Sequence, residues 1–222
     1  MQKNYSNDLY SEVFNKIYHQ STVYNSSFAS VPYLLKAAKN HHGENGLNIL
    51  FLISAIQENA SVEERSKIDK SILAFYDKAI TEANNLLDTY FVSLHDKENA
   101  VWILTAKFAF NYELQFSKIL EGFLNEEFYC VCKNCSEEVF IWPKESILVA
   151  YQSDPVFNKN TKCCNVEPSL KLEGNFKKLY EWAGLLKQKF IQELTPYLAG
   201  EVVCPHCSYN FNLSEQLQEG ID

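Results

Sequence analysis

The feature that most constrains this chain is a pair of C-x-x-C hooks, each with two cysteines separated by two residues. The first hook spans residues 132–135 and the second spans residues 204–207. Four thiolates from two such hooks form the ligand set of a closed tetrahedral zinc site. Because such a site leaves no coordination position open, its usual role is structural. The sequence therefore predicts one structural Zn²⁺ per chain, with these ligands: Cys132, Cys135, Cys204 and Cys207.

Three other cysteines complete the total of seven. Cys130 precedes the first hook and is an alternative ligand to Cys132, but C-x-C makes a poorer hook, so the spacing favours Cys132. Cys163 and Cys164 lie within residues 153–168, where prolines and asparagines predict a loop. They are interpreted as unpaired loop thiols, with a second metal ion as the alternative. The odd count and the metal-like spacing favour reduced thiols over disulfides.

Short β-prone runs flank both hooks, at residues 128–131, 139–142, 202–203 and 211–213. This is the outline of a zinc ribbon, in which two hairpin tips hold one ion, with Pro143 ending the second run. The hooks are separated by residues 136–203. Loop closure costs only about 0.6 kcal/mol more for each doubling of length. Apparent zinc-binding free energies are about 10–16 kcal/mol. A split ribbon is therefore expected.

The first 126 residues carry apolar side chains at helical spacing. The pattern predicts helices over about 5–18, 26–42, 44–59, 61–90, 96–110 and 112–124, and another at 175–198 inside the insertion. Ser26 or Ser27 is expected to cap the second helix, with Pro32 in its first turn. Ser61 and Glu64 have capping-box spacing and are expected to open the long fourth helix. Short polar joints favour antiparallel helix pairs.

The charge of the chain argues against nucleic acid as a partner. The formal net charge is −8, and Arg65 is the single arginine. Residues 127–143 and 200–222, which hold the hooks, together carry a net charge of −6. Phosphate would be repelled by such segments. The amino terminus lacks the apolar stretch of a secretory signal, and no segment is long and apolar enough to cross a bilayer. A cytoplasmic protein without membrane or nucleic-acid binding is therefore expected.

Catalytic motifs are not visible in the sequence. The five histidines lie outside any H-E-x-x-H arrangement, and neither G-x-S-x-G nor a P-loop is present. An enzyme is therefore not expected, although a triad assembled in space stays open. His206 lies inside the second hook, where a solvent-facing position is usual. One segment, residues 18–34, mixes tyrosines with hydrogen-bonding side chains at a helix joint. Its candidate partner-binding residues are His19, Gln20, Thr22 and Tyr24.

The same segment resembles a motif of bacterial HEAT- or armadillo-like helical repeat proteins. In that motif a His-Gln-x-Thr-Val-Tyr turn leads into a Ser-Phe-Ala-x-Val-Pro-x-Leu helix, and the likeness covers mainly residues 5 to about 60. Some such proteins carry a split zinc ribbon after the helices, and some look like immunity proteins beside secreted toxins. The resemblance implies a binding scaffold and assigns no catalytic residue. The varied helix lengths here do not match a regular superhelix.

These observations predict a mostly α fold. HEAT-like stacked antiparallel helix pairs are expected over residues 1–126. A small β zinc ribbon, interrupted by a helical insertion at about 175–198, is expected over residues 127–222. The expected function is a non-enzymatic protein-binding scaffold with a structural zinc site, in particular an immunity protein that neutralises a secreted toxin. The alternatives are a zinc-ribbon protein associated with nucleic acid, and an enzyme with a site within residues 18–32.

Overall fold

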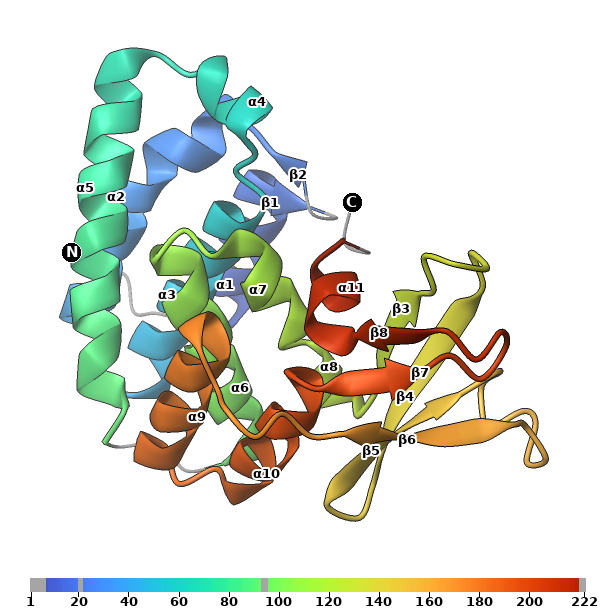
Figure 1. Cartoon of the computed structure of the whole chain (residues 1–222). Helices are drawn as coiled ribbons and strands as arrows, with labels where there is room; N and C mark the ends of the chain where they lie inside the picture. Colours follow the sequence, from blue (N-terminus) through green and yellow to red (C-terminus); the bar gives the residue numbers. More distant parts are fainter. Residues whose placement is uncertain (1–6, 20–21, 93–95, 220–222) are drawn as a thin grey trace. The chain divides into compact units, whose positions relative to one another are not determined.

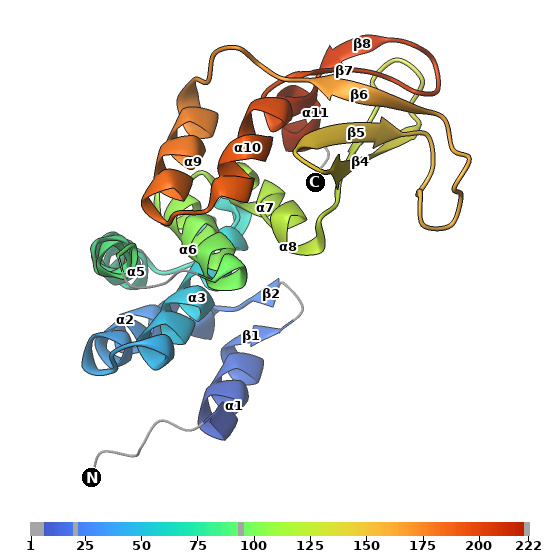
Figure 2. The ribbon, with the colours of Figure 1, turned by 90° about the horizontal axis from the view of Figure 1, so that it is seen from below.

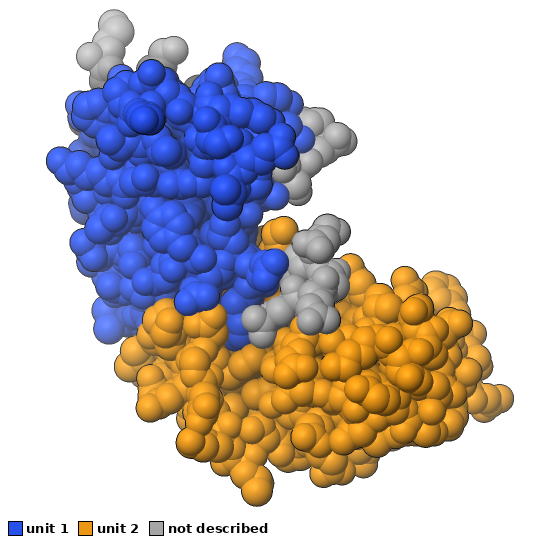
Figure 3. Space-filling model, turned by 45° about the horizontal axis from the view of Figure 1, so that its top comes forward, with its two compact units in different colours: residues 1–93, 105–117 blue, residues 94–104, 118–222 orange. Residues whose placement is uncertain are grey.

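The computed structural model describes residues 7–19, 22–92 and 96–219 (Figure 1). By its internal contacts the chain divides into two compact units, coloured separately in Figure 3. Unit 1 comprises residues 1–93 and 105–117, and unit 2 comprises residues 94–104 and 118–222. Helix α6 (Lys97–Phe110) contributes residues to both. The domain ranges 1–126 and 127–222 expected from the sequence differ from these units and stay a prediction.

Unit 1 is built from helices and one short hairpin. Its elements are α1 (Asn7–Ile17), β1 (Tyr18–His19), β2 (Thr22–Val23), α2 (Asn25–Asn40), α3 (Glu44–Glu58), α4 (Val62–Ser66), α5 (Lys70–Leu87), the 3₁₀ helix η1 (Asp88–Tyr90) and parts of α6 and α7 (Leu114–Ile119). Helix α2 packs against α3 and α5, and α3 also packs against α5. Phe28 of α2 and Tyr76 of α5 are fully buried and in ring contact. Three mutually contacting helices therefore form this core.

Several helix boundaries differ from the sequence pattern. The predicted helix over 61–90 is divided: Ser61 caps α4 as expected, accepting from the Glu64 amide at 3.1 Å, but Asp69 then caps a separate α5. The predicted helix over 112–124 is likewise divided into α7 and α8 (Gly122–Asn125). At the first of these breaks the Asp69 carboxylate accepts a hydrogen bond from the Ser71 amide, a contact that competes with a continuous helix.

The start of α2 also differs from expectation. Tyr24, rather than Ser26 or Ser27, is the N-cap residue. The Ser27 hydroxyl instead accepts from the Tyr24 amide at 2.8 Å and donates to the Ile17 carbonyl at 2.5 Å. Pro32 lies in the middle of α2, beyond its first turn. Because proline has no amide hydrogen, one helical hydrogen bond is missing there.

Unit 2 holds a six-stranded antiparallel sheet with the order β3-β4-β5-β6-β7-β8. Its strands are β3 (Phe128–Val131), β4 (Glu138–Lys144), β5 (Ile147–Tyr151), β6 (Cys163–Glu167), β7 (Glu201–Val203) and β8 (Asn210–Asn212). Helices α9 (Gly174–Leu185) and α10 (Lys189–Leu198) connect β6 to β7, and α11 (Leu213–Glu219) follows β8. The described chain is thus mostly α with one substantial β part.

The insertion between the hooks contains more secondary structure than the single helix predicted at 175–198. That segment forms two helices, because Lys187 adopts a left-handed backbone, with φ 58°, between α9 and α10. The loop expected over 153–168 is also wrong in part, since β6 pairs with β5 and β7 there. Pro143 does not end its strand: β4 continues to Lys144, with Pro143 opposite Leu148.

The two faces of the sheet differ in burial. Alternate residues such as Cys130, Ile141 and Ala150 are fully buried on the inner face. Helix α10 contacts β5 and helix α11 contacts β3, and both helices lie beside the sheet in Figure 2. Gly200 permits the pairing of β7 with β6, since a Cβ there would lie 1.9 Å from the Glu167 carbonyl oxygen. The strands therefore join into one sheet only with glycine at that position.

Candidate metal centre

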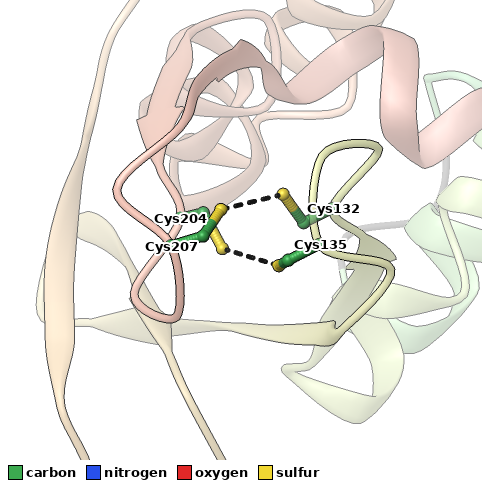
Figure 4. A group of neighbouring side chains, drawn as sticks. All are labelled: Cys132, Cys135, Cys204 and Cys207. Carbon is green, nitrogen blue, oxygen red and sulfur yellow. Dashed lines mark hydrogen bonds between the residues drawn. The ribbon is translucent and has the colours of Figure 1, made fainter.

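The four hook cysteines meet at one point. The first hook forms the β3–β4 turn and the second forms the β7–β8 turn. Their four Sγ atoms all lie within 4.8 Å of one another. The Sγ atoms of Cys132 and Cys207 are 3.8 Å apart, as are those of Cys135 and Cys204, and Figure 4 draws both contacts. Each close contact is between one hook and the other, so the cluster lies between the two hairpins.

This arrangement fits a tetrahedral metal ion. In a tetrahedron with metal–sulfur bonds of about 2.3 Å, neighbouring sulfur atoms are separated by about 3.8 Å. The two cross-hook separations of 3.8 Å match that edge length. They are far longer than the bond of about 2.05 Å that a disulfide requires. Tetrahedral sites of four sulfur ligands hold zinc or iron, so the residues fit a metal of this class.

The two hooks have the same backbone hydrogen-bond pattern. The Ser136 amide donates to the Cys132 carbonyl at 2.7 Å, and the Ser208 amide donates to the Cys204 carbonyl at 2.9 Å. Ser136 and Ser208 also share a left-handed backbone, with φ of 60° and 64°. Such φ values favour glycine because a Cβ is crowded there. The turn geometry is therefore kept in both hooks although neither has glycine at this position.

We expect Ser136→Gly and Ser208→Gly each to stabilise the protein. Each change removes a Cβ from a left-handed residue, and the expected gain is about 0.5–1 kcal/mol after the added chain entropy is subtracted. The measurement is the midpoint of chemical unfolding of the metal-loaded protein. Ser146→Gly, in the β4–β5 turn at a residue without positive φ, is the matched control and should give no gain. Equal effects at all three serines would contradict the prediction.

Side chains of each hook also reach across to the other hairpin. Asn134 Nδ2 donates to Cys207 Sγ at 3.4 Å. His206 Nε2 lies 3.0 Å from the Glu138 carbonyl oxygen, which requires the hydrogen on Nε2. Lys133 forms a longer ion pair, 3.9 Å, with Glu215 of α11. His206 is therefore not simply solvent-facing as the sequence suggested; it helps to lock the hairpins together.

Two of the four hook thiols have strongly shifted pKa values without metal. The hydrogen bond from Asn134, followed by one from the Tyr209 amide, lowers the pKa of Cys207 to about 6. Burial raises the pKa of Cys204 to about 12. At neutral pH the Cys207 sulfur is therefore mostly thiolate and available to a metal, whereas Cys204 must lose a proton to become a ligand.

Metal affinity is expected to fall as the pH falls. Between pH 8 and pH 6.5 the Cys204 proton alone makes the apparent dissociation constant rise at least about tenfold per pH unit, because metal and proton compete for one sulfur. Below the Cys207 pKa of about 6 the dependence becomes steeper, since a second proton competes. Competition with a chromophoric chelator at several pH values measures this. A flat profile would contradict thiolate ligation.

The remaining cysteines are outside the cluster. Cys132, rather than Cys130, belongs to the group of four. Cys130 faces the sheet interior, and burial raises its pKa to about 12. Cys163 and Cys164 are adjacent on β6, not on a loop, and their side chains alternate between exposed and half-buried. Among the described residues, neither of these two is part of a candidate metal group.

The cluster closes the sheet on itself. Strands β3 and β8 are the two edges of the sheet order, yet the cysteines of their hairpin turns lie within 4.8 Å of one another. Figure 1 shows the sheet curled so that its first and last hairpins approach each other. Helix α11 leads back from β8 and contacts β3. A metal here would hold both free edges, where unpaired backbone groups otherwise invite unwanted strand pairing.

The predicted partner-binding residues lie in unit 1. His19 and Thr22 are opposite each other in the β1–β2 hairpin, and Thr22 and Tyr24 are exposed. Gln20 lies outside the described residues, and the His19 side chain is not described. The hairpin is tied to α3, because Asn59 Nδ2 donates to the Tyr18 hydroxyl at 3.0 Å. Partner binding by the four candidate residues stays a prediction.

The fold and site together define a protein with a helical unit and a curled sheet whose edges meet at a four-cysteine cluster. No protein-family model, curated protein or solved structure matches the chain. In the part of the chain that the structure describes, no helix is both long and apolar enough to span a membrane.

Proposed function

We propose that this protein is a non-enzymatic, protein-binding scaffold whose sheet is closed by one structural Zn²⁺. The observation that carries the proposal is the cluster of four Sγ atoms within 4.8 Å at the junction of two hairpins. Four protein ligands leave no open position for a substrate or an activated water, which suits a structural ion. We prefer zinc to iron because Zn²⁺ has no redox chemistry and therefore cannot promote oxidation of its thiolate ligands.

The particular role that we propose is that of an immunity protein, which occupies the active surface of a secreted toxin. Its support is the net charge of −8, which suits a basic partner surface, together with the likeness of residues 18–34 to helical repeat proteins. A reducing, cytoplasmic location is part of the proposal, because the thiols must stay available to the metal.

The metal part is tested by elemental analysis of protein purified without added metal. One zinc per chain is the expected result. Visible absorption from bound iron would show that iron takes the place of zinc. Less than about 0.2 metal ions per chain, with unchanged stability after chelation, would reject a structural metal altogether.

The binding part is tested by capture of partners from the lysate of the native host, with mass spectrometry of the bound proteins. The tagged wild type is compared with Cys204→Ser, which lacks one proposed ligand. A single near-stoichiometric partner with a toxin or secretion signature supports the immunity role, whereas a different single partner supports only the scaffold. Turnover of a substrate without any partner, or salt-sensitive binding to DNA or RNA, would reject both in favour of the alternatives.

A further inference from the structure

The outer face of the sheet carries a row of aromatic side chains. Strand pairing places Tyr129 of β3 opposite Phe140 of β4, and Phe140 opposite Tyr151 of β5. These three residues alternate with buried inner-face neighbours along each strand, so all point outward. We call Tyr129, Phe140 and Tyr151 the aromatic row. Adjacent strands are about 4.8 Å apart, so the row extends about 10 Å across the sheet.

The aromatic row is open to solvent mainly at its Tyr129 end. Tyr129 is 58% exposed, and Phe140 and Tyr151 are half-buried, whereas the inner-face residues between them are fully buried. A sheet with one solvated face usually alternates apolar-in with polar-out. Val149, on the same face as Tyr151, is only 3% exposed, so packing accounts for the Tyr151 end of the row but not for the exposed ring of Tyr129.

The charge around the aromatic row is negative. Glu138 is exposed on the same face, two residues along β4 from Phe140 and opposite Val131, and Glu127 immediately precedes β3. The exposed Lys144 is also on this face, but it lies at the far end of β4, four residues from Phe140. The sheet and its adjoining segments, residues 127–173 and 199–222, hold eleven acidic residues against five lysines, a net charge of −6. The faces of aromatic rings attract cations, and nearby carboxylates add to the attraction.

We infer that the aromatic row, with Glu138 at its side, is the docking site for a basic, extended segment of a protein partner. Arginine or lysine side chains of that segment stack on Tyr129 and Phe140 and pair with Glu138. The inference rests on the proposed protein-binding function and names the face and the partner chemistry. The charge complementarity favours this occupant over nucleic acid or an anionic membrane, both of which the net charge of −6 repels.

The test uses the full metal-loaded chain and a fluorescein-labelled octapeptide of alternating arginine and valine, measured by fluorescence anisotropy. The matched probe replaces each arginine with glutamate. The test variant is Tyr129→Thr with Phe140→Thr, since threonine keeps strand propensity without the ring. The control is Phe75→Ala, which removes an aromatic side chain that is 68% exposed on α5 in unit 1.

We expect the arginine peptide to bind with a dissociation constant below 1 mM and the glutamate peptide not to bind in that range. The double variant should bind about tenfold more weakly, because it loses two exposed cation–π contacts. Phe75→Ala should bind like the wild type, Tyr129→Phe should keep full affinity, and Glu138→Gln should reduce the salt dependence. Circular dichroism confirms that each variant retains the sheet.

The inference is overturned if both peptides bind equally, if neither binds below 1 mM, or if the double variant binds like Phe75→Ala. Preference for single-stranded DNA or for vesicles of anionic lipid over the arginine peptide would overturn it as well. Capture of the native partner from the host lysate separates this inference from the proposed function. If the double variant captures that partner as well as the wild type does, the aromatic row is not the docking site but the scaffold role stands.

Discussion

Cys132→Ser is expected to abolish stable metal binding and to unfold the curled sheet of unit 2. Cys132 is fully buried and supplies one of the four thiolates. Structural zinc sites contribute about 10–16 kcal/mol of apparent binding free energy, which is as large as the whole stability of most domains, about 5–15 kcal/mol. The expected result is loss of bound zinc together with loss of the cooperative unfolding transition of the sheet, measured by elemental analysis and near-ultraviolet circular dichroism.

Cys163→Ser is the matched control, because Cys163 is an exposed thiol on β6 of the same sheet and lies outside the cluster. It should retain the metal and change stability by less than about 0.5 kcal/mol. Cys204→Ser should behave like Cys132→Ser, because it removes a ligand from the other hook. If Cys132→Ser keeps wild-type stability, the cluster does not hold the sheet together, and the structural role of the metal is wrong.

The second large effect is expected for Phe123→Ala. Phe123 is 1% exposed in α8, and its ring contacts Phe128 of β3 and Phe190 of α10 at centroid distances of 5.2 Å and 5.6 Å. Truncating a buried phenylalanine to alanine costs about 3–5 kcal/mol, from lost burial and the cavity left behind. The Phe123 ring lies between β3 and α10, so the loss of stability should appear in the unfolding of unit 2. Urea titration at saturating metal measures it.

Phe157→Ala provides the comparison, since Phe157 is 87% exposed on the β5–β6 loop of the same unit. Its substitution should change stability by no more than about 0.5 kcal/mol. Phe123→Leu should lose less than Phe123→Ala because it leaves a smaller cavity. Similar losses for Phe123→Ala and Phe157→Ala would show that the Phe123 ring does not anchor the sheet.

Much of the helical architecture could be predicted from local patterns. Helices α3 and α6 follow their apolar period almost to the predicted residue, and the Ser61 cap appears where its spacing indicated. The predictions that failed lie where local signals are weak. A lysine gives no sequence signal for a left-handed backbone, so the break at Lys187 between α9 and α10 could not be predicted. Strand β6 contains Asn165 and exposed alternate residues, and only its neighbours β5 and β7 make it a strand.

The candidate site also has a part that could be predicted from the sequence and a part that could not. The identity of its four cysteines could be predicted, because metal ligation depends on residue type and on short spacings that persist along the chain. The cross-hook contacts of Asn134 and His206 could not, since they join residues about 70 positions apart and depend on how the hairpins face each other. A C-x-x-C hook carries no sequence signal for such contacts.

By itself, therefore, the sequence determined the ligand set, the helical character of the first half and the acidic charge, because these depend on residue chemistry and on periods of a few residues. The tertiary structure alone decided that both hooks belong to one six-stranded sheet, that the cluster joins its two edges, and that Tyr129, Phe140 and Tyr151 form a row. The physical reason is strand register: a shift of one residue would turn each ring to the opposite face, and register is set by pairing between distant segments.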